Sequence, residues 1–309
     1  MIKNLLSLIL ILFILSTFLY FNFINNQNNN NQNKEIEKIN IKVEEKKVEN
    51  LELPKVFLNN LFEDTFDKGE ILEETGNMEK SLSPHWWVNS GAFLIQENGI
   101  ARTLFGALEE DSEWQIKYSN GKRDIPEETD GGYYPQNIFR LITKSKWQNF
   151  RQEAYFKIVK YNLSNSKHRS ESNGLLFFSR YKDQYNLYYA GIRVDGTAVI
   201  KKKINKEYYI ISQGKIFDGE FDKKINPNLL PINQWIGIRN EIKTVDRNKV
   251  EIKIFIDEKR TGNWELVLVA IDDGKSYGGE AILSEEYAGI RTDFMDVKFD
   301  NYKIEDITD

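Results

Sequence analysis

Tyrosine, arginine and lysine side chains recur between residues 172 and 203, and they are well suited to bind a ligand. In the segment 186–194, Tyr189 and Arg193 fall on one face of an extended chain, whereas Tyr188 and Ile192 fall on the other, because successive side chains of a strand point to opposite faces. Arginine holds carboxylates through two parallel hydrogen bonds, and an aromatic ring offers an apolar face to a sugar. The pattern predicts a surface for an acidic glycan, formed by Tyr189 and Arg193 with Arg140, Arg180, Lys201 and Lys203. The alternative is an ordinary solvated sheet face, on which lysine and arginine keep a protein soluble.

Three consecutive strands are expected to carry these residues, at 174–181, 186–194 and 198–203, with a polar turn at 182–184 and the hairpin signal Asp195-Gly196 between them. Other segments with strand character follow along the chain, at 61–66, 93–96, 114–118, 137–143, 152–161, 208–213, 234–242, 249–256, 264–272, 287–292 and 297–305. More than ten short strands with few helical periods indicate an all-β, two-sheet antiparallel jelly-roll β-sandwich. We expect it to form one domain over residues 58–309.

The composition supports a β-rich core and excludes several kinds of site. Of 309 residues, 40% are hydrophobic and 13% aromatic, and aromatic rings suit a pleated, half-buried surface. The net charge of −5 provides no global field for recruiting nucleic acid. Because cysteine is absent, disulfides, thiolate metal sites and thiol nucleophiles are excluded. The sequence also lacks a phosphate-binding glycine motif, so nucleotide use is not expected.

The N-terminal segment predicts a membrane attachment. Residues 5–24 are almost all leucine, isoleucine and phenylalanine, and a helix of about 20 such residues spans a bilayer core. We expect residues 1–24 to form an uncleaved transmembrane signal-anchor; the alternative is a cleaved signal peptide, whose apolar region is usually shorter. Residues 25–57 begin with an Asn/Gln run, continue with mixed charges and are predicted to be a linker. Either interpretation places the domain outside the cytoplasm, at the cell surface or in the periplasm.

Four stretches give the domain a resemblance to a known superfamily. They are LFEDTF at 61–66, WQNF at 147–150, the hairpins at 174–203, and the pair of strands at 286–304. Together they resemble the concanavalin A-like lectin/glucanase superfamily, which includes laminin-G-like modules, family 16 glycoside hydrolases and several polysaccharide lyases. The resemblance implies the jelly-roll fold. It does not choose an activity, because such folds host lectins, hydrolases and lyases alike.

The resemblance also implies a structural calcium ion between the first and last strands. Asp300 would be a side-chain ligand, with Glu63 or Asp64 opposite it and the carbonyl of Gly91 nearby. Carboxylate and carbonyl oxygens are the ligands that calcium prefers. The alternative is that Asp300 and Asn301 simply hydrogen-bond to a strand end.

The sequence favours a membrane-anchored, carbohydrate-binding module for an acidic glycan and leaves an enzyme open. A family 16 hydrolase would carry an E-x-D-x-x-E strand, but the stretch that begins at Glu251 has Lys253 at the third position. A polysaccharide lyase acting at the same face would need a cation to neutralise a uronate and a tyrosine or histidine to move a proton. Arginines and Tyr189 are present for this, whereas His168 is predicted to lie exposed in a polar loop. A second alternative is a module that binds another envelope protein.

Overall fold

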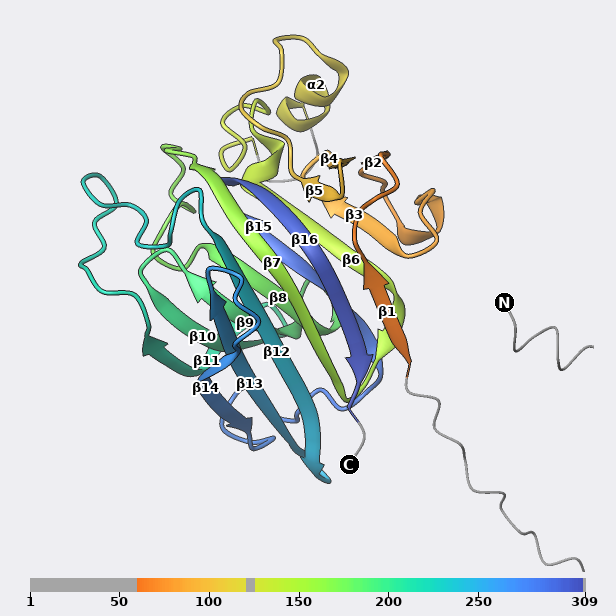
Figure 1. Ribbon diagram of the computed structural model, residues 1–309, viewed down its shortest axis with the longest axis vertical. Coiled ribbons are helices and arrows are strands. Elements are labelled where there is room, and N and C mark those ends of the chain that lie inside the picture. The colour runs from red at the N-terminus through yellow and green to blue at the C-terminus, as the bar shows by residue number, and fades with distance from the viewer. Residues whose placement is uncertain (1–59, 121–125, 308–309) are drawn as a thin grey trace, which may run out of the picture. The chain divides into compact units, whose positions relative to one another are not determined.

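Alternating apolar side chains build two antiparallel sheets that pack face to face. The computed structural model describes residues 60–120 and 126–307, which belong to the compact unit Phe57–Asp309. The nine-stranded back sheet has the order β14-β13-β12-β7-β16-β5-β4-β2, with β1 paired to β16. The seven-stranded front sheet has the order β11-β10-β9-β8-β15-β6-β3. The predicted two-sheet, all-β sandwich is therefore confirmed (Figure 1).

The back sheet takes its strands from both ends and the middle of the domain. Its strands are β1 Leu61–Asp64, β2 Ile71–Glu73, β4 Phe93–Glu97, β5 Ile100–Arg102, β7 Phe150–Tyr161, β12 Trp235–Asp246, β13 Lys249–Glu258, β14 Glu265–Asp272 and β16 Met295–Asp306. The front sheet contains β3 Trp86–Ser90, β6 Ile138–Trp147, β8 Gly174–Asp183, β9 Asn186–Arg193, β10 Thr197–Ile204, β11 Glu207–Lys215 and β15 Glu286–Asp293. Short helical segments η1 Met78–Lys80, α2 Glu113–Ser119 and η2 Pro135–Asn137 connect them.

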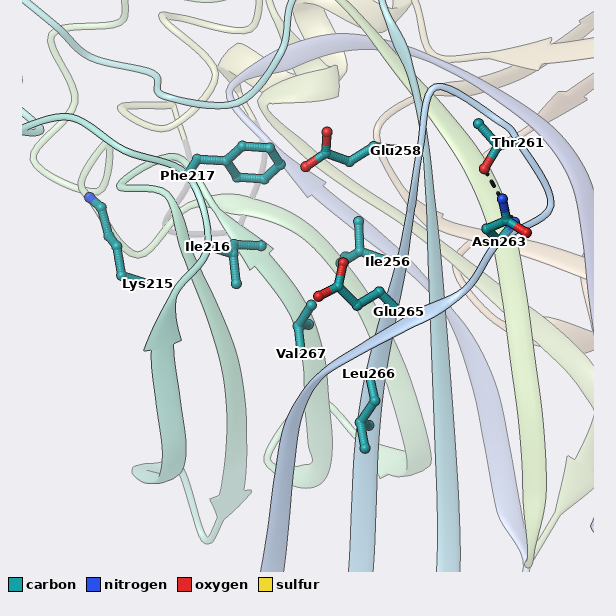
Figure 2. A pocket seen from close by; sticks show the side chains of 10 residues that line it. All are labelled: Lys215, Ile216, Phe217, Ile256, Glu258, Thr261, Asn263, Glu265, Leu266 and Val267. Atoms are coloured by element: carbon teal, nitrogen blue, oxygen red, sulfur yellow. Dashed lines mark hydrogen bonds between the residues drawn. The ribbon is translucent and has the colours of Figure 1, made fainter.

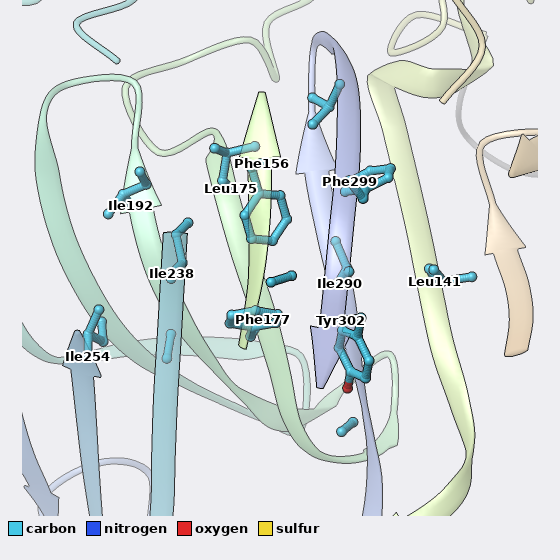
Figure 3. Packing of buried hydrophobic residues seen from close by; sticks show 14 of the residues in the cluster. Leu141, Phe156, Leu175, Phe177, Ile192, Ile238, Ile254, Ile290, Phe299 and Tyr302 are labelled. Carbon is cyan, nitrogen blue, oxygen red and sulfur yellow. The ribbon is translucent and has the colours of Figure 1, made fainter. Parts of the chain in front are cut away.

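The hydrophobic core lies between the two sheets, where aromatic rings from both layers meet. Phe156 of the back sheet contacts Phe177 of the front sheet edge-on, with 5.6 Å between ring centroids, and packs against Phe299 at 5.8 Å. Tyr302 reaches the same group and lies 6.5 Å from Phe177 (Figure 3). These rings are almost fully buried. Burial of apolar surface on this scale stabilises the sandwich by about 25 cal/mol for each Å² removed from water.

The segment 114–118, which the sequence predicts to be a strand, is instead the helix α2. Ser112 caps its N-terminus by accepting a hydrogen bond from the Gln115 amide at 3.4 Å. A serine in this position satisfies one of the free amides of a first helical turn, and this local signal outweighs the β propensity of the aromatic residues.

The predicted anchor at 1–24 and the linker up to residue 57 lie outside the described residues. Within 60–120 and 126–307, none of the helices is long and apolar enough to cross a bilayer.

Candidate functional site

A pocket of about 600 Å³ lies on the outer face of the front sheet and contains most of the predicted ligand-binding residues. We call it the front pocket. Its lining comes from strands β6, β8, β9, β10, β11 and β15 and from the loops before β6 and β8. The lining residues are Glu128, Ile138, Arg140, His168, Ser170, Ser172, Asn173, Leu176, Arg193, Lys201, Lys203, Tyr208, Ile210, Arg291, Asp293 and Phe294.

The strand register explains why these side chains share one face. Arg140 on β6 lies directly opposite Arg291 on β15, and Arg291 lies opposite Leu176 on β8. Leu176 in turn lies opposite Gly191 on β9. A Cβ atom at Gly191 would lie 2.2 Å from the Leu175 carbonyl oxygen, so the glycine lets β8 approach closely. One outward-facing row therefore crosses four strands and has two arginines at one end.

Four of the six predicted ligand-binding residues line the front pocket: Arg140, Arg193, Lys201 and Lys203. Lys201 lies opposite Tyr189, and Lys203 lies opposite Leu187, as the period of two requires. The intervening Lys202 points into the core and is completely buried. The alternation that the sequence shows thus sorts the three lysines correctly between the two faces.

Tyr189 lies beneath the pocket rather than in its wall. It is on the expected face but only 3% exposed, so it does not offer the open stacking surface that the sequence suggested. Its hydroxyl accepts a hydrogen bond from Arg291 Nη1 at 3.3 Å, and Lys201 Nζ lies 5.4 Å from its ring centroid. The ring of Tyr208 lies 6.0 Å away. Neighbouring strands therefore cover Tyr189, which joins an apolar cluster on this face with Leu176, Phe178, Leu187 and Val199.

Arg180 does not lie on this face, so the prediction that it binds a ligand there is wrong. The register between β8 and β9 shifts after Ser179, and Arg180 has a φ of 48°, so the alternation breaks at this point. The side chain is completely buried and donates hydrogen bonds to four acceptors. These are the carbonyls of Gln148 (3.0 Å) and Ile282 (2.6 Å), Asn149 Oδ1 (3.1 Å) and Thr244 Oγ1 (2.9 Å). Arg180 is a structural residue that holds connecting segments together.

Tyr208 and Arg291 are pocket residues that the site prediction missed. Tyr208 and Ile210 are two positions apart on β11 and share one face. Tyr208 is 51% exposed, and Lys203 Nζ lies 4.5 Å from its ring centroid. The Arg291 side chain extends from β15 and donates a hydrogen bond to the Tyr189 hydroxyl. Both were recognisable from the period of two, since Tyr208 follows the hairpin after Lys203 and Arg291 lies in one of the predicted strands.

The cations of the pocket are only partly neutralised. Arg193 Nη2 lies 2.5 Å from Asp195 Oδ2, and Arg291 Nε lies 2.8 Å from Asp293 Oδ1. Within the described ranges, no carboxylate pairs with Arg140, Lys201 or Lys203 at salt-bridge distance. The front pocket therefore carries an excess of positive charge in a partly desolvated place, where charges interact more strongly than in water.

Two groups of the pocket have lowered pKa values. Burial, together with the neighbouring Arg291 guanidinium, lowers the pKa of Lys201 to about 8. Burial acts to raise the pKa of Tyr208, but the cations Arg291 and Lys203 outweigh burial and lower this pKa to about 8. The Tyr208 shift reflects the excess of cations, whereas burial is the larger cause at Lys201.

His168 lies in the loop that forms one wall of the pocket. Its side chain is half-exposed, as the sequence predicted, and its Nδ1 is 3.6 Å from Glu128 Oε1. The same wall carries the polar residues Ser170, Ser172 and Asn173.

The residues expected to hold calcium do not fit that ion. Arg260 Nη1 lies 2.6 Å from Asp300 Oδ2 and already provides the positive charge there. Asp64 accepts hydrogen bonds from the Trp86 indole at 2.7 Å and from the Phe66 amide at 2.8 Å, and Glu63 pairs with Lys303. The part of the chain that the structure describes contains no group of three or more His, Cys, Asp or Glu side chains able to hold a metal ion. Asp300 thus follows the alternative prediction, in which protein groups satisfy it.

A second pocket of about 620 Å³ opens at the edge of the sandwich, between the end of β11 and strands β13 and β14. Its lining includes the carboxylates of Glu258 and Glu265 and the apolar side chains of Ile216, Phe217 and Ile256 (Figure 2). None of the predicted site residues lines it. With two carboxylates in its wall, it does not suit an acidic ligand.

Comparison with family models and with curated proteins found no match. Among solved structures, the carbohydrate-binding module CBM66 from Bacillus subtilis matches at a TM-score of 0.38 and 17% identity, over 54% of this chain and 81% of that chain. A β-glucanase from Bacillus licheniformis matches at 0.41 and 9%, over 81% of this chain and 99% of that one. The GH43 protein BlXynB from Bacillus licheniformis matches at 0.40 and 10%, over 78% of this chain and 38% of that longer one.

At such TM-scores and identities the likeness carries no argument about what this protein does. The two-sheet architecture rests on the strand pairing of this chain itself, and the function must be argued from the front pocket.

Proposed function

We propose that this protein binds an acidic polysaccharide in the front pocket. The observation that carries the proposal is the pairing of Arg140 directly opposite Arg291 on adjacent strands. Like charges in opposed positions of a sheet destabilise it, and of these two arginines only Arg291 pairs with a carboxylate, that of Asp293, among the residues that the structure describes. A bound carboxylate or sulfate group would accept hydrogen bonds from both arginines and remove this repulsion.

The rest of the pocket suits a sugar better than a small inorganic anion. The half-exposed ring of Tyr208 offers an apolar face beside Lys203. Ser170, Ser172 and Asn173 supply donors and acceptors for hydroxyl groups along one wall. A protein-binding face, the other predicted alternative, would favour a flat apolar patch, whereas this face is hollowed and cationic.

Isothermal titration calorimetry of the full-length chain tests this proposal. Polygalacturonate should bind, a neutral polymer such as dextran should not, and Arg140→Met should weaken polygalacturonate binding by about tenfold or more. Arg247→Met is the matched control, because Arg247 is exposed in the turn between β12 and β13. Equal affinity for the neutral polymer, or equal losses in the two variants, would contradict the proposal.

We also propose that residues 5–24 hold the protein at a membrane with the sandwich on the outer side. The support is the length and composition of this apolar segment. The protein should remain in the membrane pellet after alkaline carbonate washing, and protease added to intact cells or spheroplasts should digest the sandwich. Release into the wash would indicate a cleaved signal peptide instead.

A polysaccharide lyase is a second candidate, favoured by the lowered pKa of the Tyr208 hydroxyl beside Arg291 and Lys203. In such a reaction a base takes the proton next to the uronate carboxylate, a cation stabilises the resulting charge, and the glycosidic oxygen leaves with a proton. His168, in the same pocket, could carry one of the two protons. The hydrolase alternative is weaker, since Asp293, one of the two lining carboxylates, is bound to Arg291.

The ultraviolet absorbance of the unsaturated product distinguishes the two candidates. A lyase would release such product from polygalacturonate, and Tyr208→Phe would abolish release while keeping most of the binding. Binding without any product selects the non-catalytic module.

A further inference from the structure

From the free edge of the back sheet and the acidic pocket beside it, we infer that strand β14 is a docking site for an extended segment of a partner protein. The segment adds to the sheet as a further strand and places one lysine or arginine side chain in the second pocket, near Glu258 and Glu265. This site shares no lining residue with the front pocket, and it is independent of the proposed function.

Strand β14 has an edge that no other strand covers. Within the described ranges, Glu265–Asp272 pairs only with β13, because β14 is the last strand of its sheet (Figure 1). Its sequence ELVLVAID contains no lysine, arginine or proline, the residues that commonly prevent another chain from pairing with an edge. The opposite edge of the same sheet is β2, which has three residues where β14 has eight. The backbone of β14 is therefore open to an added strand.

The outer face of β14 is apolar and exposed. Leu266, Val269 and Ile271 are 48%, 42% and 48% exposed, respectively. Leu266 lies opposite Phe255 on β13, whose ring is only partly buried, so the apolar surface continues onto the neighbouring strand. An added strand covers these side chains with its own and removes apolar surface from water, which favours binding.

The pocket at the beginning of β14 carries negative charge. Glu265 lies opposite Ile256 on β13, and Glu258 follows Ile256 by two residues, so both carboxylates are on the face of the sheet that bears the core. Diagonal neighbours of this kind are about 7–8 Å apart. Neither carboxylate forms a salt bridge with a residue that the structure describes. Lys215, the single lysine of the lining, donates instead to two backbone carbonyls at 2.7 and 2.9 Å.

This pocket suits the side chain of a lysine or arginine. The two carboxylates can accept its hydrogen bonds, and the apolar residues Ile216, Phe217 and Val267 can pack against its methylene groups. Side chains of an added strand alternate between the two faces of the sheet. A residue beside Glu265 therefore projects towards the pocket, whereas its neighbours in the segment lie beside the exposed Leu266.

Charge favours a partner protein over a second copy of this chain. If two copies paired antiparallel along the whole of β14, Glu265 of each copy would oppose Asp272 of the other. Like charges in opposed positions destabilise a sheet, and β14 itself brings no cation to the pocket. A partner segment that carries a lysine or arginine avoids this repulsion and neutralises the pocket.

Fluorescence anisotropy of labelled peptides, titrated with the full-length chain, tests the inference. The probes are as long as β14, eight residues, and alternate valine with threonine, with lysine at one of the threonine positions. Each has a control with glutamate in place of the lysine. We expect the best lysine peptide to bind at least about tenfold more tightly than its glutamate control. If no lysine peptide binds more tightly than its control, the inference is wrong.

Backbone methylation of the best peptide tests whether it adds as a strand. Alternate amides of a strand face the same neighbour. N-methylation of one alternate set should therefore abolish binding, and N-methylation of the other set should leave most of it. Equal effects of the two sets would contradict strand addition.

Variants of the protein locate the cationic side chain. Glu258→Gln and Glu265→Gln should each weaken binding of the best lysine peptide by about twofold to fivefold, and the double variant should lose the preference for lysine over glutamate. Glu109→Gln, exposed in the loop before α2, is the matched control and should leave the affinity unchanged. Full affinity in the double variant would overturn the inference.

Hydrogen exchange identifies the docking edge directly. Binding of the lysine peptide should slow exchange at the amides of 265–272. Slowed exchange only elsewhere in the chain would overturn the inference. Slow exchange of these amides without peptide, together with a concentration-dependent dimer in sedimentation, would also overturn it, because the edge would then belong to a second copy.

Discussion

Three consecutive lysines on β10 provide the sharpest test of how this fold divides its residues between stability and binding. Lys201 and Lys203 line the front pocket, whereas Lys202 is completely buried between the sheets. The Lys202 ammonium lies 2.9 Å from Asp272 Oδ2 and donates to the carbonyls of Gly279 at 3.0 Å and of Glu280 at 2.7 Å. All three of its hydrogens are therefore used, which is the condition for keeping a charged lysine inside a protein.

The expected loss for Lys202→Met follows from this geometry. Methionine fills a similar volume but leaves the buried Asp272 carboxylate without its cation, with the Tyr188 hydroxyl at 2.6 Å as a remaining donor. Removing one partner of a buried ion pair costs about 3–5 kcal/mol. For a domain of this size each kcal/mol lowers Tm by about 2–4 °C, so Tm should fall by roughly 6–20 °C. Lys201→Met and Lys203→Met should change the stability by no more than about 0.5 kcal/mol.

Urea unfolding and calorimetric titration with polygalacturonate, done on the same preparations, separate the two roles. Lys202→Met should lose stability, and Lys201→Met and Lys203→Met should lose affinity. Should Lys202→Met fail to fold, the double variant Lys202→Met with Asp272→Leu keeps the test open, because replacing both charges removes the buried carboxylate and should recover part of the stability. An unchanged Tm for Lys202→Met, or an equal loss for Lys201→Met, would refute the assignment of faces.

Three further predictions follow from the same structure. Affinity for polygalacturonate should fall as the pH rises from about 7 through 8, because Lys201 loses its positive charge and Tyr208 gains a negative one there. In Lys201→Arg the fall should be smaller, and a pH-independent affinity in the unmodified protein would contradict this account. Adding EDTA or calcium should leave Tm unchanged, because Arg260 already neutralises Asp300. A rise in Tm of several degrees on adding calcium would instead support the predicted metal site. Arg180→Met should lower the free energy of unfolding by about 3 kcal/mol or more, since it leaves several buried acceptors without donors. Urea unfolding measures this loss, and a loss as small as that of an exposed side chain would contradict the prediction.

The sequence allowed the face of a side chain to be predicted wherever the strand alternation continued unbroken. The period of two placed Lys201 and Lys203 on one pocket because β9 and β10 pair without interruption over these positions, and it placed Arg193 there because β9 and β8 pair regularly up to that residue. It failed at Arg180, where an irregularity in β8 moves the side chain to other partners. Such an irregularity depends on pairing between strands that are distant in the sequence, and no local pattern predicts it.

The burial of Tyr189 shows a second limit of prediction from one strand. Its face was predictable, but its exposure depends on Tyr208 and Arg291, which arrive from β11 and β15. The surroundings of Asp300 show the same limit. Its ion-pair partner Arg260 comes from the turn after β13, 40 residues away in the chain, and the pattern around Asp300 does not reveal it.

The two outer faces of the sandwich differ in where their unpaired cations lie, and this difference supports the front pocket as the proposed ligand site. On the back sheet, several charged side chains neutralise one another within the face: Arg151 lies 2.5 Å from Glu241, Arg239 lies 2.6 Å from Glu153, and Lys253 lies 2.7 Å from Glu251. Lys157 lies opposite Lys298 on this face without a carboxylate partner among the described residues, but neither lysine lines either of the two pockets. On the front sheet, the pocket holds Arg140 opposite Arg291 and leaves two lysines without carboxylates among the residues that the structure describes. Because the whole chain is acidic, with a net charge of −5, this local excess of cations does not come from composition, and an anionic ligand is the simplest means of compensating it.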